Sequence, residues 1–177
     1  MKGHANIPWC SAEEWNQVIL SIKRIDRLYE GKLDRVYDTA IKIRQKFEEL
    51  SEPIEKICSH TCVYCEDVCC VRATIWYDFK DLLYIYFGLN TFPESQIIKK
   101  IEGNRQRSCW HFSEKGCMLS RIERPFVCIW YFCSVQKKYL VLHHHKIKES
   151  IDKLLIDIKD LRNKMEEEFI RVSCPNL

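Results

Sequence analysis

The cysteines constrain this chain more than any other feature of its sequence. Eleven cysteines occur in 177 residues, and nine of them fall between Cys58 and Cys133, leaving Cys10 and Cys174 outside. Core packing usually scatters thiols along a chain, so this concentration needs another explanation. Three explanations compete: disulfide bonds, redox or catalytic thiols, and metal ligation.

Metal ligation fits the sequence best. Disulfide bonds belong to oxidising compartments, whereas residues 1–15 lack the apolar core of a signal peptide and the cysteine count is odd. Redox or catalytic chemistry needs one or two thiols rather than nine. Metal sites use several thiolates at short spacing. We therefore expect a cytoplasmic protein that binds metal through its cysteines.

The clustered cysteines form two groups. Their spacing is Cys58-x3-Cys62-x2-Cys65-x3-Cys69-Cys70 in the first group and Cys109-x7-Cys117-x10-Cys128-x4-Cys133 in the second. A two-residue gap, as between Cys62 and Cys65, lets a tight turn aim two thiolates at one ion. The predicted metal ligands are Cys62, Cys65, Cys69, Cys70, Cys109, Cys117, Cys128 and Cys133, with Cys58 as an alternate. Because two four-cysteine sites would use eight of the nine thiols, we expect two centres, or a single larger cluster, with one thiol spare.

Two of these spacings limit the geometry. Cys69 and Cys70 are neighbours, so their side chains are expected to diverge; either each serves a different site or one of them packs. Cys128 and Cys133 are five residues apart, which does not place them on one face of a helix. Their spacing predicts an irregular segment, or ligands that point at separate centres.

Arginines accompany the cysteines. A metal centre held by four thiolates carries about two net negative charges, which hydrogen-bond donors must offset. The arginines within or beside the groups are Arg72, Arg105, Arg107, Arg121 and Arg124. We expect Arg72 and Arg124 to donate hydrogen bonds toward the ligand sulfurs and to offset their negative charge. Arg124 is the better candidate because it lies four residues before Cys128. The alternative is that these arginines only keep the surface soluble.

Histidines offer weaker candidates for the same centre. His60 lies between two cysteines and is an alternative ligand, and His111, two residues after Cys109, is a candidate hydrogen-bond donor. The run His143–His145 is expected to be a solvated linker before an amphipathic helix.

Both ends of the chain have helical periodicity. Ser11 and Glu14 have the spacing of a capping box, and an apolar stripe follows over residues 15–29. A second stripe covers residues 33–50, with Gly31 as a candidate break and Pro53 as the expected end. The C-terminal segment has a heptad seam, formed by Ile147, Ile151, Leu154, Ile158, Leu161 and Met165.

Two shorter helices are expected between the cysteine groups. Residues 78–87 are rich in large apolar side chains and precede Gly88, which is a typical C-terminal signal. Thr91 and Glu94 have capping-box spacing ahead of an apolar stripe over residues 97–101. The segment from Cys109 to Cys117 is expected to be a loop, and no strand-like alternation of any length occurs.

The predicted fold is a small, mainly α domain whose long N- and C-terminal helices pack around or beside an irregular, cysteine-rich, metal-binding core. Its segments are an N-terminal helical part over 1–57, the cysteine-cluster core over 58–135 and a C-terminal amphipathic helix over 136–177. We expect the terminal helices to pack on each other; a coiled coil with a protein partner is the alternative. The longest apolar stretches are about half a membrane span, and a net charge of +3 without a basic run predicts neither a membrane nor a nucleic-acid partner.

The cysteine pattern resembles the YkgJ-like cysteine-cluster family, which is named for a CxxCxxCC motif and described as zinc- or iron-chelating. The residues that carry the resemblance are Cys62, Cys65, Cys69 and Cys70, then Cys109, Phe112, Gly116, Cys117 and Leu119, then Arg124, Pro125, Cys128 and Cys133. It covers about 75 residues and omits the terminal helices. It implies metal chelation by up to eight cysteines and no agreed reaction, although the motif accompanies a flagellin lysine methylase activity in some relatives.

The first group departs from the family pattern. Three residues, 66–68, separate Cys65 from the cysteine pair where the family has two, and Cys58 is an added thiol. Cys58 is therefore a candidate to replace a displaced ligand.

An iron–sulfur cluster is the favoured cofactor, with Zn²⁺ as the alternative. Structural zinc sites usually pair two CxxC motifs, and this chain has one clean pair, whereas irregular spacing beside aromatic residues suits a shielded cluster. We expect a redox, metal-handling or accessory role. The alternatives are a structural zinc module that binds another protein and a cluster-dependent methyl- or group-transfer enzyme. Against an enzyme, the chain has no glycine-rich phosphate loop, no HExxH and no serine elbow.

Overall fold

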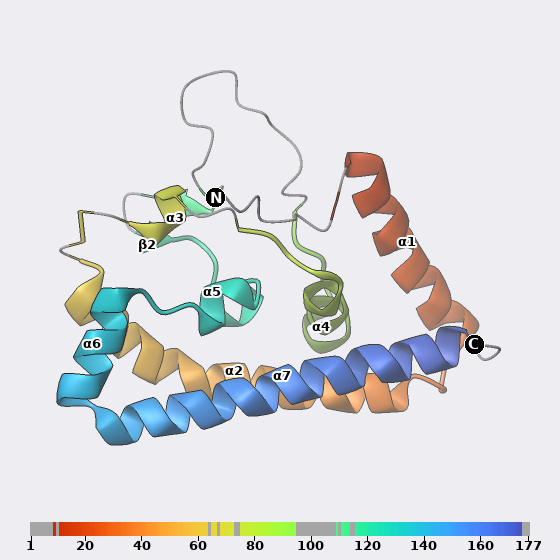
Figure 1. Ribbon diagram of the computed structural model, residues 1–177. Coiled ribbons are helices and arrows are strands. Elements are labelled where there is room, and N and C mark those ends of the chain that lie inside the picture. The colour runs from red at the N-terminus through yellow and green to blue at the C-terminus, as the bar shows by residue number, and fades with distance from the viewer. Residues whose placement is uncertain are drawn as a thin grey trace, which may run out of the picture.

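Two long helices lie side by side and run in opposite directions in the computed structural model (Figure 1). They are α2, Asp34–Thr61, and α7, His145–Ser173. The structure describes residues 9, 11–63, 65–66, 68–72 (backbone alone at 71 and 72), 75–94, 109, 111–113 and 116–174. The mainly α class is confirmed, and among these residues no helix is both long enough and apolar enough to pass through a bilayer.

The N-terminal helix begins and ends where its sequence signals lie. Helix α1, Ala12–Leu28, starts after Ser11, whose hydroxyl accepts a hydrogen bond from the Glu14 N–H at 3.2 Å. The break falls at Gly31, whose φ of 75° is a left-handed conformation that glycine adopts without strain. Helix α2 therefore starts as a separate helix.

Helix α2 does not end at Pro53, and that prediction is wrong. It continues to Thr61 because its core-facing stripe continues: Ile54 and Ile57 are 3% and 2% exposed. A proline inside a helix costs about 3 kcal/mol, and burying two isoleucines returns roughly 1.5–3 kcal/mol each. The extra turns carry Cys58 to the end of the helix.

Helix α4, Phe79–Leu89, also runs past its expected end. It begins with a capping box between Asp78 and Asp81, but it ends at Asn90, which has a φ of 54°. Gly88 lies inside the helix and close to α2. A Cβ added at this position would meet the Ala40 backbone oxygen at 3.3 Å and the Tyr84 ring at 3.2 Å. This glycine permits close packing of α4 on α2.

The heptad seam of α7 faces the core, with Ile151, Ile158 and Met165 buried. Arg162, outside the seam, is buried as well. Its guanidinium pairs with Asp81 Oδ1 at 2.5 Å and Asp78 Oδ1 at 2.8 Å. This buried ion pair joins α7 to α4.

The remaining elements are short and lie between α2 and α7 in the sequence. They are α3 (Cys69–Arg72), β1 (Phe112–Ser113), β2 (Gly116–Cys117), η1 (Arg121–Glu123), α5 (Val127–Trp130) and α6 (Ser134–His143). The expected loop from Cys109 to Cys117 contains instead a small antiparallel hairpin, in which Phe112 pairs with Cys117. The expected segment boundaries at 57/58 and 135/136 fall inside α2 and α6, and the helix predicted between Thr91 and Gly103 lies, from residue 95 onward, outside the described residues.

Candidate metal centre

The predicted ligands gather at one end of the α2–α7 pair. The end of α2, together with α3, β2, α5 and α6, lies toward this end, whereas α1 stands at the other (Figure 1). All nine clustered cysteines have free thiols. The fold thus brings together segments that are up to 75 residues apart, counted from Cys58 to Cys133.

Four thiols form what we call the hairpin group: Cys70, Cys109, Cys117 and Cys128. Burial raises the pKa of Cys128 to about 12, with further increases from Cys109 and Cys117. The pKa of Cys70 is raised first by a hydrogen bond with Cys69, then by burial and by the charges of Cys69, Cys109 and Cys128. The four thiols are therefore close enough to act on one another electrostatically.

Backbone hydrogen bonds hold this group. The Cys109 N–H donates to the Cys70 carbonyl at 2.7 Å, which joins the hairpin to α3. The Met118 N–H donates to the His111 carbonyl at 2.8 Å, which extends the hairpin beyond Cys117. Because these bonds link α3 to the hairpin, Cys70 and Cys117 are fixed on one framework.

The segment that carries Cys128 is anchored in the core. Asp81 Oδ1 accepts a hydrogen bond from the Phe126 N–H at 3.0 Å and also binds Arg162. Burial raises the pKa of Asp81 to about 6, while the Arg162 guanidinium opposes the rise. The carboxylate, paired with Arg162, holds the start of α5 in place.

Arg124 is the arginine that the sequence predicts to support the ligand sulfurs. Its Nε and Nη2 donate to the Leu119 carbonyl at 3.1 and 3.0 Å. Its positive charge lowers the pKa of Cys109 and of Cys128, against the larger effect of burial. Arg124 thus affects the hairpin group through its charge alone, because its hydrogen bonds go to the Leu119 carbonyl between β2 and η1. The side chain of Arg72 lies outside the described residues, as do Arg105 and Arg107.

Two further thiols form what we call the α2 group: Cys58 and Cys62, on the last turn of α2. Burial raises the pKa of Cys62 to about 11, and the adjacent Cys58 raises it further. Gln136 of α6 faces both thiols, with its Nε2 3.6 Å from the Cys58 sulfur and 3.5 Å from the Cys62 sulfur. These two cysteines, four residues apart, thus share one amide donor.

Arg121 of η1 is buried next to the α2 group. Burial lowers its pKa, and so does the nearby Arg124, whereas Cys58 attracts and hydrogen-bonds the guanidinium. Its side chain is 5% exposed, and its Nε has no hydrogen-bond partner among the residues that the structure describes. A buried cation of this kind calls for an anion beside it.

Cys69 connects the two groups. It contributes to the raised pKa of Cys62 in the α2 group and of Cys109 in the hairpin group. A hydrogen bond with Cys69 is the largest cause of the raised pKa of Cys70, so these neighbouring thiols interact. In a single helical turn, χ1 rotation allows adjacent thiols to approach each other.

Cys65 and Cys133 occupy the edges of the array. The Cys65 N–H donates to the Cys62 carbonyl at 3.1 Å, in the turn after α2. Cys133 caps α6, and its N–H donates to Gln136 Oε1 at 3.1 Å. The expectation that Cys128 and Cys133 do not share a helix face is confirmed, because Cys128 lies within α5 and Cys133 precedes α6.

The thiols lie near one another but do not have the geometry of a coordination sphere. Within the described part of the chain, no three His, Cys, Asp or Glu side chains converge tightly enough to enclose a metal ion. The donor set nevertheless suits a soft metal: four thiols in the hairpin group, the number that a zinc ion or a four-iron cluster takes, with the positive charge of Arg124 beside them. Loading would require modest thiol movements and the loss of their protons.

Sequence reasoning missed Gln136 and understated Arg121. Gln136 stands three residues after Cys133, the N-cap and N3 spacing of a capping box, which is a readable signal. Nothing local to Arg121 distinguishes it from the other arginines, because its burial depends on α2. Nor did the sequence single out the buried pair of Asp81 and Arg162.

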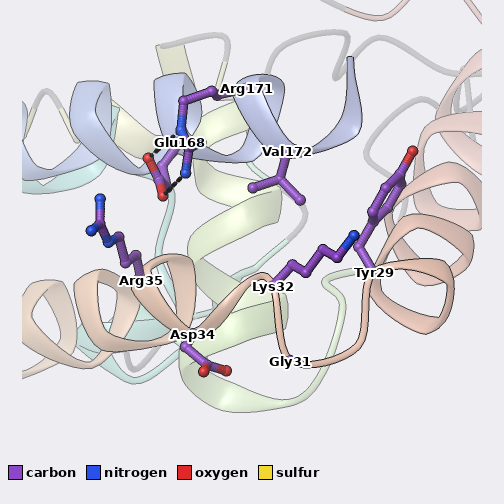
Figure 2. A pocket seen from close by; sticks show the side chains of 8 residues that line it. All are labelled: Tyr29, Gly31, Lys32, Asp34, Arg35, Glu168, Arg171 and Val172. Carbon is purple, nitrogen blue, oxygen red and sulfur yellow. Dashed lines mark hydrogen bonds and ion pairs between the residues drawn. The ribbon is translucent and has the colours of Figure 1, made fainter. Parts of the chain in front are cut away.

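The other end of the α2–α7 pair has a hollow with different chemistry. Figure 2 shows this cavity of about 610 Å³, lined by Tyr29, Gly31, Lys32, Asp34, Arg35, Glu168, Arg171 and Val172. Its charges are mixed, and the Arg171 guanidinium pairs with Glu168 at 2.6 Å. It contains no thiol, so it is separate from the cysteine array.

No family model, curated protein or solved structure matches this chain. The resemblance to the YkgJ-like family stays a prediction from its motifs.

Proposed function

We propose that this chain is a cytoplasmic metal-binding protein with one or two cysteine-ligated centres, iron–sulfur in preference to zinc, in a redox, metal-handling or accessory role. One observation carries the proposal: three separate segments of the chain bring the four thiols of the hairpin group close enough for their charges to affect one another's pKa. These segments are α3, the hairpin and α5. Four thiolates are the usual ligand set of a four-iron cluster.

Charge supports the proposal. A four-thiolate centre is a net anion, and Arg121 and Arg124 lie close enough to repel each other beside the thiols. Two neighbouring guanidiniums are unfavourable unless an anion lies between or beside them. Metal-bound thiolates would supply that negative charge.

The experiment is purification of the full chain without oxygen, followed by iron, zinc and acid-labile sulfide analysis with visible and Mössbauer spectra. The proposal predicts a brown protein with iron and sulfide in equal amounts. A colourless protein with stoichiometric zinc would show that the cofactor is zinc and not an iron–sulfur cluster. A metal-free protein that stays folded with unmodified thiols would overturn metal binding altogether.

A structural zinc module is the second candidate. Trp130 and Tyr131, at the end of α5, are each 49% exposed although they are large and apolar, which is typical of a surface that meets another protein. Metal that affects only the melting temperature, with no redox couple, would favour this role over electron transfer.

A further inference from the structure

We propose that Gln136 and Arg121 are positioning residues that hold Cys58 and Cys62 as metal-binding thiolates, so that the end of α2 is a second ligand site beside the hairpin group. The proposal rests on the proposed function and adds to it. It gives Cys58, the thiol outside the family pattern, a role as a ligand.

The orientation of Gln136 is fixed from both sides. Its Oε1 accepts the Cys133 N–H at 3.1 Å, so the amide group can present only its Nε2 to the two sulfurs. Nε2 lies 3.6 and 3.5 Å from them, and the side chain is buried, at 8% exposed. An amide N–H is a stronger partner for an anionic sulfur than for a neutral thiol. The amide is thus placed to stabilise thiolates at both cysteines.

Arg121 supplies the charge. Its buried Nε has no hydrogen-bond partner among the described residues, and Cys58 raises its pKa more than Glu55 does. A thiolate at Cys58 would neutralise this buried cation, which is costly to leave unpaired. The guanidinium would thus stabilise the negative sulfur, and the sulfur would neutralise the buried guanidinium.

The position of the α2 group explains why two donors are needed. Cys58 and Cys62 lie at the C-terminus of a 28-residue helix, where the unpaired carbonyls carry partial negative charge. A thiolate there is destabilised by its own helix. Donors from α6 and η1 offset this effect.

Gln136→Glu tests the amide with little change in shape. The carboxylate keeps an acceptor for the Cys133 N–H but removes the donor from the sulfurs and adds a negative charge. We expect release of metal to a chelator to become about 10–100-fold faster, as is usual when a partner of a ligand is lost. For an iron–sulfur centre the reduction potential should also shift to more negative values. Gln45→Glu, an exposed change on α2, is the matched control and should alter neither.

Arg121→Lys tests the same site without touching the α6 cap, and it decides the outcome if Gln136→Glu fails to fold. Lys keeps the charge but loses the planar fork, so release should again accelerate, and Arg121→Gln should accelerate it further. Wild-type release rates and potential in folded variants of both residues would overturn the inference and leave the proposed function standing. A metal-free wild-type protein would overturn both.

Discussion

The hairpin group and the α2 group differ in the number of thiols they gather and in the hydrogen-bond donors that lie beside these thiols. The hairpin group gathers four thiols from three segments and has the Arg124 guanidinium nearby, already bonded to the Leu119 carbonyl. The α2 group has two thiols from the end of one helix, with Gln136 facing both sulfurs and Arg121 beside Cys58. The hairpin group thus has more thiols, whereas the α2 group has more hydrogen-bond donors directed at its sulfurs.

The largest expected effect is on the hairpin group. Cys128→Ser and Cys117→Ser should each abolish metal binding at this group and unfold the hairpin region, because binding energy there is folding energy. Metal analysis and circular dichroism check this result. Cys174→Ser, at an exposed position beyond the array, is the control. Full metal content in both variants would remove the hairpin group from the site.

The next effect concerns the anchor of α5. Arg162→Met leaves Asp81 buried without its partner and should lower the free energy of unfolding by about 3–5 kcal/mol. Since Asp81 holds the Phe126 N–H, metal loss should be greater at the hairpin group than at the α2 group. Denaturant unfolding measures the stability. Lys46→Met, which breaks an ion pair with the half-exposed Asp157, should cost under about 1 kcal/mol.

A smaller effect is expected at the α2 group. Cys58→Ser should weaken metal retention without abolishing it, because the hairpin group keeps its four thiols. Metal per chain, measured by native mass spectrometry, should fall to an intermediate value. A loss of metal as complete as that of Cys128→Ser would mean that both groups ligate one centre through Cys69. The α2 group would then not be a separate site.

The smallest effect is away from the thiols. Gly88→Ala should destabilise the fold by about 1 kcal/mol, because overpacking costs about 1–3 kcal/mol and the gain in helix propensity returns about 1 kcal/mol. Thermal unfolding measures this change, and metal content should stay at the wild-type value. A more stable variant would show that α4 can move away from the Ala40 carbonyl.

The features predicted correctly from the sequence are those set by neighbouring residues. The cap at Ser11, the break at Gly31 and the seam of α7 follow from local hydrogen bonding and periodicity. The ends of α2 and α4 were predicted wrongly because Pro53 and Gly88 are local stop signals that core packing overrides. The cysteine spacing predicted which thiols to consider, but no spacing rule sorts them into groups.

The sequence alone determined that this chain is mainly helical and that nine thiols concentrate between residues 58 and 133, because periodicity and composition are properties of the chain itself. The tertiary structure decided which thiols meet, and that Gln136 and Arg121 face Cys58 and Cys62. It also paired Asp81 with Arg162, 81 residues apart. Contacts of this range depend on how the helices pack, which is a property of the whole core rather than of any segment.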